Sequence, residues 1–192
     1  MAKLYKVLDK DGYSCHGGEA KWSLPTQNED GTWTPGDWMD DIHGELEICD
    51  NGYHVVKFDQ LIYWLNTRIF EVEVDGEIIE DYDKSVCRKC RLVRELTAWN
   101  ERSVRLFTCD CAEHVLPIFE RKYPNDNRPR KAIETARLYA DGNVTEEELG
   151  AAWSAALAAA RDAARSAALD AAEDSAEEWQ TNKLQEYLKE GK

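Results

Sequence analysis

The sequence has no apolar run long enough to cross a membrane, and its first seven residues, Met-Ala-Lys-Leu-Tyr-Lys-Val, lack the apolar region of a secretory signal. We therefore expect a cytoplasmic protein with no membrane partner, whose six cysteines remain reduced thiols rather than disulfides. No nucleophile elbow, phosphate-binding loop or dinucleotide fingerprint is present. These absences argue against the common hydrolases and nucleotide-dependent enzymes.

Positive charge is also scarce, because 24 Lys and Arg face 38 Asp and Glu and give a net charge of −14. Such a chain is a poor ligand for nucleic-acid phosphates and suits a basic protein partner. Residues 30–83 hold 15 acidic and 2 basic side chains, whereas residues 84–140 hold 13 basic and 7 acidic ones. Either the two segments attract each other, or each presents a binding face of its own sign.

Alternating polar and apolar residues in the first 83 positions predict strands over 4–7, 45–49, 53–58 and 69–79. Asn51-Gly52 predicts a hairpin turn, and Asp75-Gly76 predicts a turn or a bulge. Residues 22–41 are rich in Pro, Gly and Trp, which predicts irregular chain held by aromatic side chains. Within it, Trp33 and Trp38 are candidate binding residues.

From Lys84 onward the apolar spacing becomes three to four, which predicts an all-helical domain over residues 84–192. A first helix is expected through Val86 and Leu96, and Asn100 is expected to begin the next one. Pro117 should kink or end that second helix. The other predicted boundaries are a helix start at Asn127 with Pro129 in its first turn, and a stop at Asp141-Gly142.

The last helix is predicted over residues 146–188, starting from a capping box of Thr145 and Glu148. A break near Ser175 stays open. Pairs of Ala recur every four residues from 151/152 to 171/172. This alanine-rich helix could be a spacer, pack against other helices of the chain, or drive a self-assembling homo-oligomer. The predicted fold class is therefore α+β, with a small β-rich domain over 1–83 before the helical domain.

Two pairs of metal-type side chains stand out, Cys87 with Cys90 and Cys111 with His114. The residue types suit zinc. However, Cys111 and His114 also fall on an apolar helix face with Phe107, where a buried thiol and a core histidine are the simpler interpretation. We expect no metal ion and no cofactor.

Three short segments, His16-Gly17-Gly18, Gly52-Tyr53-His54 and Glu71-Val72-Glu73, occur in the order found in ADP-ribosyltransferases, which they resemble. This resemblance implies an NAD-using enzyme, or an inactive relative of one, with His16, Glu71 and Glu73 as catalytic candidates. It also implies that His16 and Glu73 converge on one pocket. The alternative is that alternating strands produce Glu-x-Glu by chance.

A basic cluster is formed by Arg128, Arg130, Lys131 and Arg137 at and after a helix start, where the helix dipole favours anions instead. It is a candidate binding patch for an anion or an acidic partner. The alternative is that these side chains pair with the acidic N-terminal half, or with Glu120 and Asp126.

Larger segments support a family resemblance: Trp99-Asn-Glu-Arg102, residues 107–117, residues 128–137 and the alanine array. Together, residues 99–188 resemble a helical immunity-protein family of bacterial polymorphic-toxin loci and actinobacterial phages. Residues 1–98 resemble a small uncharacterised domain of phage proteins, through Gly-Tyr-His, Glu-Val-Glu-Val and Asp-Lys-Ser. The resemblance implies a non-enzymatic, phage-encoded protein that binds and inhibits a host or toxin protein inside the bacterial cell.

Overall fold

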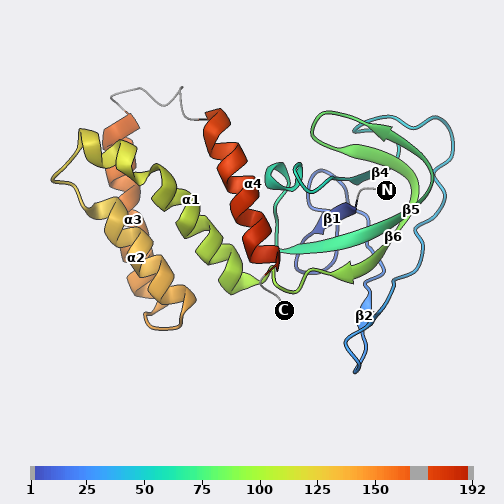
Figure 1. The fold of residues 1–192 in the computed structure, drawn as a ribbon, viewed down its shortest axis with the longest axis horizontal. Helices are drawn as coiled ribbons and strands as arrows, with labels where there is room; N and C mark the ends of the chain where they lie inside the picture. The colour runs from blue at the N-terminus through green and yellow to red at the C-terminus, as the bar shows by residue number, and fades with distance from the viewer. Residues whose placement is uncertain (1–2, 165–172, 190–192) are drawn as a thin grey trace. The chain divides into compact units, whose positions relative to one another are not determined.

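The computed structural model describes residues 3–164 and 173–189, with side chains at 3–158 and 177–189. The described chain divides into a first unit that ends at Trp99 and a second unit, Asn100–Lys189. Strands fill the first unit and helices the second, so the predicted α+β class is confirmed (Figure 1). None of the described helices combines the length and apolar character needed to cross a bilayer.

The first unit is built on a curled antiparallel sheet. Its strands are β1 (Leu4–Leu8), β5 (Arg68–Glu80), β6 (Ser85–Glu95) and β4 (Tyr53–Val55), in the spatial order β1-β5-β6-β4. The two edge strands meet where Tyr5 and Val56 exchange backbone hydrogen bonds of 2.8 and 2.9 Å. The sheet therefore closes on itself as a half-barrel, and one of its faces becomes an interior.

That interior holds the core of the first unit, because one face of every strand points into it. Leu8, Phe70 and Leu92 are fully buried there, together with Trp22 from the irregular segment. Val55, Cys87 and Cys90 complete the buried cluster. Irregular chain also covers β6 beyond β4, since the amides of Gly36, Met39 and Ile42 donate to carbonyls of β6 at 2.9–3.0 Å. A short hairpin, β2 (Thr26–Gln27) and β3 (Trp33–Thr34), precedes this cover.

The predicted helix between Lys84 and Leu96 is wrong, because β6 occupies residues 85–95 and the first described α-helix begins after Asn100. The domain boundary expected at residue 83 moves to Trp99 for the same reason. The pairing of Asp75 with Lys89 and of Ile78 with Cys87 leaves two residues of β5 opposite one of β6. This bulge confirms the irregularity predicted at Asp75-Gly76. On β6, Cys87 and Cys90 are both buried although they are three residues apart, a spacing that imitates a helix.

The chain around Gly52 is tighter than the hairpin that was predicted there. Only β4 forms on one side of the turn, and Glu47 and Asn51 make an isolated bridge on the other. Gly52 has φ of +140°, and a Cβ at this position would overlap Cγ2 of Val86. The turn therefore needs glycine for both its backbone angle and its close approach to β6. Between β4 and β5, residues 59–67 contribute one 3₁₀ turn, η1 (Leu61–Tyr63).

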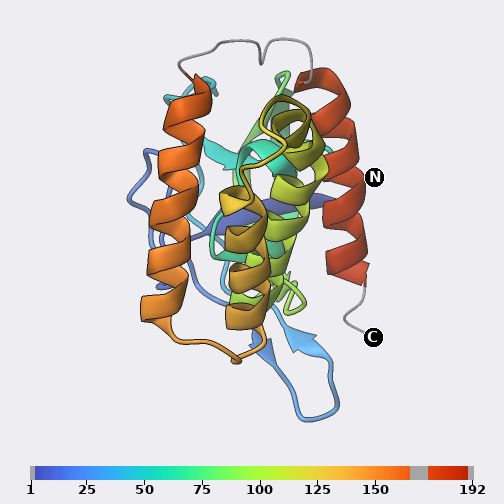
Figure 2. The same ribbon diagram turned by 90° about the vertical axis from the view of Figure 1, so that its left-hand side faces the viewer.

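The second unit is an array of four helices, α1 (Glu101–Lys122), α2 (Arg128–Ala140), α3 (Glu146–Ala164) and α4 (Glu173–Lys189). The predicted starts are confirmed: Asn100 and Ser103 form a capping box on α1, and Thr145 and Glu148 form one on α3. α1 continues through Pro117 rather than ending there. α2 packs against both α1 and α3, while α4 packs on α1 (Figure 2).

The helix expected over residues 146–188 is described as two segments, α3, which packs on α2, and α4, which packs on α1. The expected break near Ser175 falls within α4, and residues 165–172 lie outside the described chain. Of the alanine stripe, Ala152 and Ala156 are half-buried on α3, which favours packing within the chain.

Candidate functional site

The helical unit is held together around Asp110 in the middle of α1. Its carboxylate accepts hydrogen bonds from Arg137 of α2 at 2.5 Å and from the hydroxyl of Tyr187 of α4 at 2.9 Å, and Lys183 lies 3.3 Å away. Burial opposes ionisation, but these bonds hold the pKa of Asp110 below its usual value. Phe107 meets the ring of Tyr187 edge-on beside this cluster. Asp110 thus ties three helices at one point.

α3 presents apolar side chains that the array leaves uncovered. Leu149, Ala152 and Ala156 are half-buried, whereas Trp153 is 65% exposed and Leu157 is 41% exposed. The two exposed residues are four apart and lie on one face of the helix. A tryptophan this exposed contributes little to stability and much to a protein contact.

The same face of α3 is acidic at its start. Glu146, Gly150, Trp153 and Leu157 follow each other at spacings of four, three and four, so they form one stripe. We call these four residues the α3 stripe. A Cβ at Gly150 would meet nothing within 4 Å, so the stripe is open between its acidic and apolar parts. It can bury an apolar side chain of a partner and attract a basic one.

The basic cluster of α2 is largely neutralised within the second unit. Arg128 pairs with Asp126 at 2.6 Å, Arg130 pairs with Glu120 at 2.7 Å, and Arg137 pairs with Asp110 and Glu113. The alternative that these arginines pair with Glu120 and Asp126 is therefore confirmed for Arg128 and Arg130. No ion pair is recorded among the described residues for Lys131. A binding role for the cluster remains a prediction.

The acidic and basic segments of the sequence form ion pairs between the neighbouring strands β5 and β6. Acidic side chains of β5 face basic ones of β6, and Lys89 reaches Asp41 of the irregular segment. The strand pairs are Glu71 with Arg94, Glu73 with Arg91 and Glu77 with Arg88, all with N–O distances of 2.6–2.7 Å. The acidic segment therefore pairs with the β6 part of the basic segment, which confirms one of the two interpretations for residues 88–94. Trp38 joins this surface beneath Arg91, whose guanidinium lies 4.7 Å from its ring, while Trp33 lies on β3.

The residues expected to form an NAD site are separated. His16 lines a cavity of about 500 Å³ inside the first unit, and the Gly52-Tyr53-His54 segment lines it as well. Glu71 and Glu73 do not line it, because they are bound to Arg94 and Arg91 on the other face of the sheet. The expected convergence of His16 with Glu73 on one pocket is wrong, because Glu73 does not line the cavity that His16 lines.

The metal candidates are also divided. Cys87 and Cys90 are buried on β6, and the Cys87 thiol donates to the carbonyl of Tyr53 at 3.4 Å. Cys111 is half-buried on α1, where burial raises the pKa of its thiol to about 11. His114 is exposed and stacks on Trp179 of α4 with ring centres 4.1 Å apart, so the interpretation as a core histidine is wrong. Within the described ranges, no three His, Cys, Asp or Glu side chains are grouped as metal ligands.

Two functional candidates were not identified from the sequence. Trp153 and Leu157 lie within the alanine-rich array, and their spacing of four residues indicates that they share one face of the helix. Lys6 stood between Leu4 and Leu8 in an alternating strand, which places its ammonium on the inward face with them.

Comparison with protein families assigns the two parts of the chain separately. The family described as "Domain of unknown function (DUF7666)" matches residues 2–102. The family described as "Imm-5 like putative immunity protein" matches residues 94–178. The two matches meet where β6 ends and α1 begins, and they confirm both resemblances stated from the sequence. The chain matches no curated protein and no solved structure.

Proposed function

We propose that this chain, which belongs to the DUF7666 family through its first unit, is a non-enzymatic inhibitor whose helical unit binds a basic toxin protein. The match of residues 94–178 to an immunity-protein family supports an inhibitory role. The observation that carries the proposal is the α3 stripe, with Trp153 and Leu157 exposed beside an acidic turn. We further propose that the protein is phage-encoded and acts in the cytoplasm of the bacterial host.

The chemistry of the partner follows from the charges around the stripe. The first turn of α3 contains Glu146, Glu147 and Glu148, and the whole chain carries a net charge of −14. A basic partner is therefore attracted over distance and aligned on α3 before contact. Trp153 then supplies the apolar anchor, since exposed tryptophans commonly dominate the binding energy of protein interfaces.

The test is rescue of bacterial growth. A panel of toxin domains from polymorphic-toxin loci is expressed from an inducible promoter, with or without the wild-type chain. We expect the chain to restore growth against at least one basic toxin and to form a stoichiometric complex with it by size-exclusion chromatography with light scattering. Trp153→Ala should weaken that complex by about thirtyfold or more.

The matched control is Tyr82→Ala, which removes an aromatic side chain that is 83% exposed in the first unit. This variant should rescue growth like the wild type. Light scattering of the chain alone also tests the homo-oligomer considered for the alanine-rich helix. Growth rescue that survives Trp153→Ala and Leu157→Ala together would remove the α3 stripe from the proposal. No rescue against any toxin would contradict the inhibitory role.

A further inference from the structure

The cavity of the first unit has the size of a small-molecule site. Its volume is about 500 Å³, and small ligands usually occupy clefts of roughly 300–1,000 Å³. It lies beside the place where β1 and β4 meet, and its lining comes from β1, residues 14–22, residues 49–56, Trp64 and Lys84. Neither the ion pairs between β5 and β6 nor the α3 stripe contributes a residue to this lining.

A lysine ammonium lies in this cavity without a carboxylate partner. Nζ of Lys6 donates to the carbonyl of His54 at 2.9 Å and lies 5.1 Å from the centre of the Trp22 ring. Burial lowers the pKa of Lys6, and the ionisable groups that interact with it include His54 and the thiols of Cys15, Cys87 and Cys90. Among the described residues no ion pair is recorded for it. Lys6 is half-buried. Withdrawing a cation from water without a counterion is costly, and an anion entering the cavity would offset that cost.

The walls around this ammonium are flat and aromatic. The rings of Trp22 and Tyr53 meet edge-on with centres 5.6 Å apart, and those of His16 and Trp64 meet in the same way at 5.2 Å. All four side chains line the cavity. His16 is fixed by a 2.9 Å hydrogen bond between its Nε2 and the carbonyl of Trp64. A planar apolar group therefore matches the walls better than a hydrated ion does.

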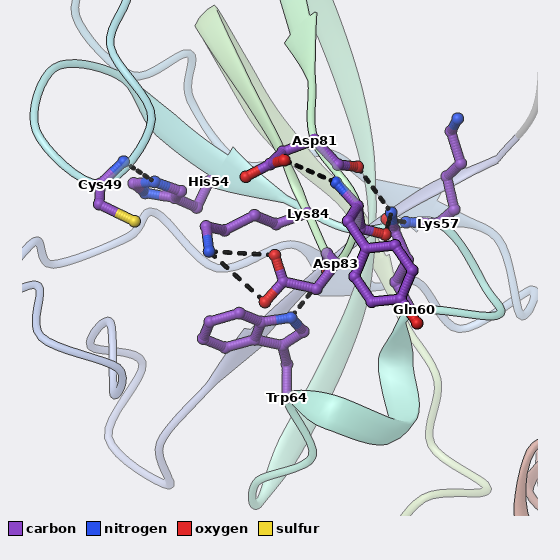
Figure 3. Close-up of polar contacts among 9 residues, drawn as sticks. Cys49, His54, Lys57, Gln60, Trp64, Asp81, Asp83 and Lys84 are labelled. Atoms are coloured by element: carbon purple, nitrogen blue, oxygen red, sulfur yellow. Dashed lines mark hydrogen bonds and ion pairs between the residues drawn. The ribbon is translucent and has the colours of Figure 1, made fainter. Parts of the chain in front are cut away.

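The rim adds no second unpaired cation. Figure 3 shows Lys84 directed at the carboxylate of Asp83, 3.1 Å away, with its ammonium above the ring of Trp64. Glu19 and Asp50 also line the cavity and add negative charge at its opening.

His54 is neutral in this arrangement, because burial lowers its pKa and its Nε2 accepts the backbone amide of Cys49 at 2.9 Å. Among the described residues that line the cavity, Lys6 is then the lysine without an ion-pair partner, and a single such charge suits a monoanion better than a dianionic phosphate.

We propose that this cavity binds a small aromatic monocarboxylate, with the carboxylate on the ammonium of Lys6 and the ring among Trp22, Tyr53 and Trp64. Gly17 and Gly18 line the cavity, and a Cβ at Gly17 would meet nothing within 4 Å, so this part of the lining is open. The binding is independent of the α3 stripe, so toxin inhibition and ligand binding can each fail alone.

The experiment is calorimetric titration of the full chain with 1-naphthoate, benzoate, the neutral isostere benzamide, and inorganic phosphate. We expect benzoate to bind about ten- to a hundredfold more tightly than benzamide, as a hydrogen-bonded charge pair gives. Naphthoate should bind more tightly still, and phosphate no better than benzamide. Lys6→Met, which keeps the apolar stem, should remove the preference for carboxylate. Lys57→Met is the control, because Lys57 pairs with Glu80 and does not line the cavity.

A second measurement, on the wild type alone, tests the proposal even if Lys6→Met does not fold. In amide NMR spectra of the wild type, naphthoate should shift the signals of Lys6, Gly17 and His54 and leave that of Lys57 unchanged. Equal affinity for benzoate and benzamide in the wild type would overturn the proposal. So would a preference for carboxylate that persists in Lys6→Met, or tighter binding of phosphate than of benzoate.

Discussion

Replacing Asp110 by Asn tests how the helical unit is held together. The substitution keeps the size of the side chain and removes its negative charge. In the wild type, that carboxylate accepts hydrogen bonds from Arg137 and from the hydroxyl of Tyr187, and Lys183 lies beside it. The Asp110 side chain is only 14% exposed, so solvent screens these interactions weakly. The polar connection between α4 and α1 should therefore weaken, because a neutral amide oxygen accepts the Tyr187 hydroxyl less strongly than a carboxylate does, while Phe107 still meets the ring of Tyr187.

The expected loss of stability in Asp110→Asn depends on which ion pairs Arg137 and Lys183 keep. Hydrogen bonds to a charged group contribute about 1.5–3 kcal/mol each, and an orphaned charge raises the cost. In the variant, Arg137 keeps Glu113 and Lys183 keeps Glu186, so neither cation is orphaned. We therefore expect Asp110→Asn to lower the free energy of unfolding by about 2 kcal/mol, near the low end of the range for one such hydrogen bond. For a unit of this size, the midpoint of thermal unfolding should fall by about 8 °C or more.

The assay is urea unfolding followed by far-UV circular dichroism, which reports the helices. Glu113→Gln is the control, because Glu113 shares Arg137 but its side chain is 52% exposed, and it should cost less than about 0.5 kcal/mol. Equal unfolding midpoints for Asp110→Asn and the wild type would refute the role assigned to Asp110.

The dependence on pH gives the same prediction an independent check. The pKa of Asp110 is lower in the folded chain than its ordinary value of 3.8, despite the opposing effect of burial. Such a carboxyl stabilises the fold above its unfolded pKa and loses that contribution as pH falls through the folded pKa. The stability difference between wild type and Asp110→Asn should therefore be complete at neutral pH and shrink below 3.8. A difference that grows with acid would contradict this reasoning.

Two further predictions concern the first unit and the thiols. Gly52→Ala should cost about 2–3 kcal/mol in urea unfolding, because its Cβ would overlap Val86 at a positive φ. Gly17→Ala, at φ +83° in open space, should cost only about 1 kcal/mol, and equal losses would contradict the contact with Val86. With a thiol reagent at mildly alkaline pH, exposed Cys49 should react first, Cys111 more slowly because burial raises its pKa, and buried Cys87 and Cys90 only as the chain unfolds. Rapid labelling of Cys87, mapped by mass spectrometry, would show that the half-barrel interior is open.

The helix starts were predictable because capping is local. Asn100 and Thr145 each bond amides or side chains within three residues, so the sequence contains both halves of the interaction. The strand β6 was not predictable in the same way. Its buried residues Cys87 and Cys90 are three apart, as in a helix, and its strand conformation depends on pairing with β5, about which no window around β6 contains information.

The functional candidates show the same limit. His16 and His54 belong to segments that stood out in the sequence, and they do line one cavity. Their expected partner Glu73 points to the other face of the sheet, where Arg91 binds it. The cation that faces the cavity is Lys6, which local patterning places inward but whose lack of a carboxylate partner depends on the tertiary fold. Exposure of Trp153 likewise depends on which face of α3 meets α2.

The most direct test of the central claim is growth of bacteria that express a basic toxin of the panel together with this chain. The account predicts that the wild type and Tyr82→Ala restore growth, that Trp153→Ala restores it poorly, and that the purified complex weakens in the same order. Full protection by Trp153→Ala, with a complex as tight as that of the wild type, would contradict binding through the α3 stripe.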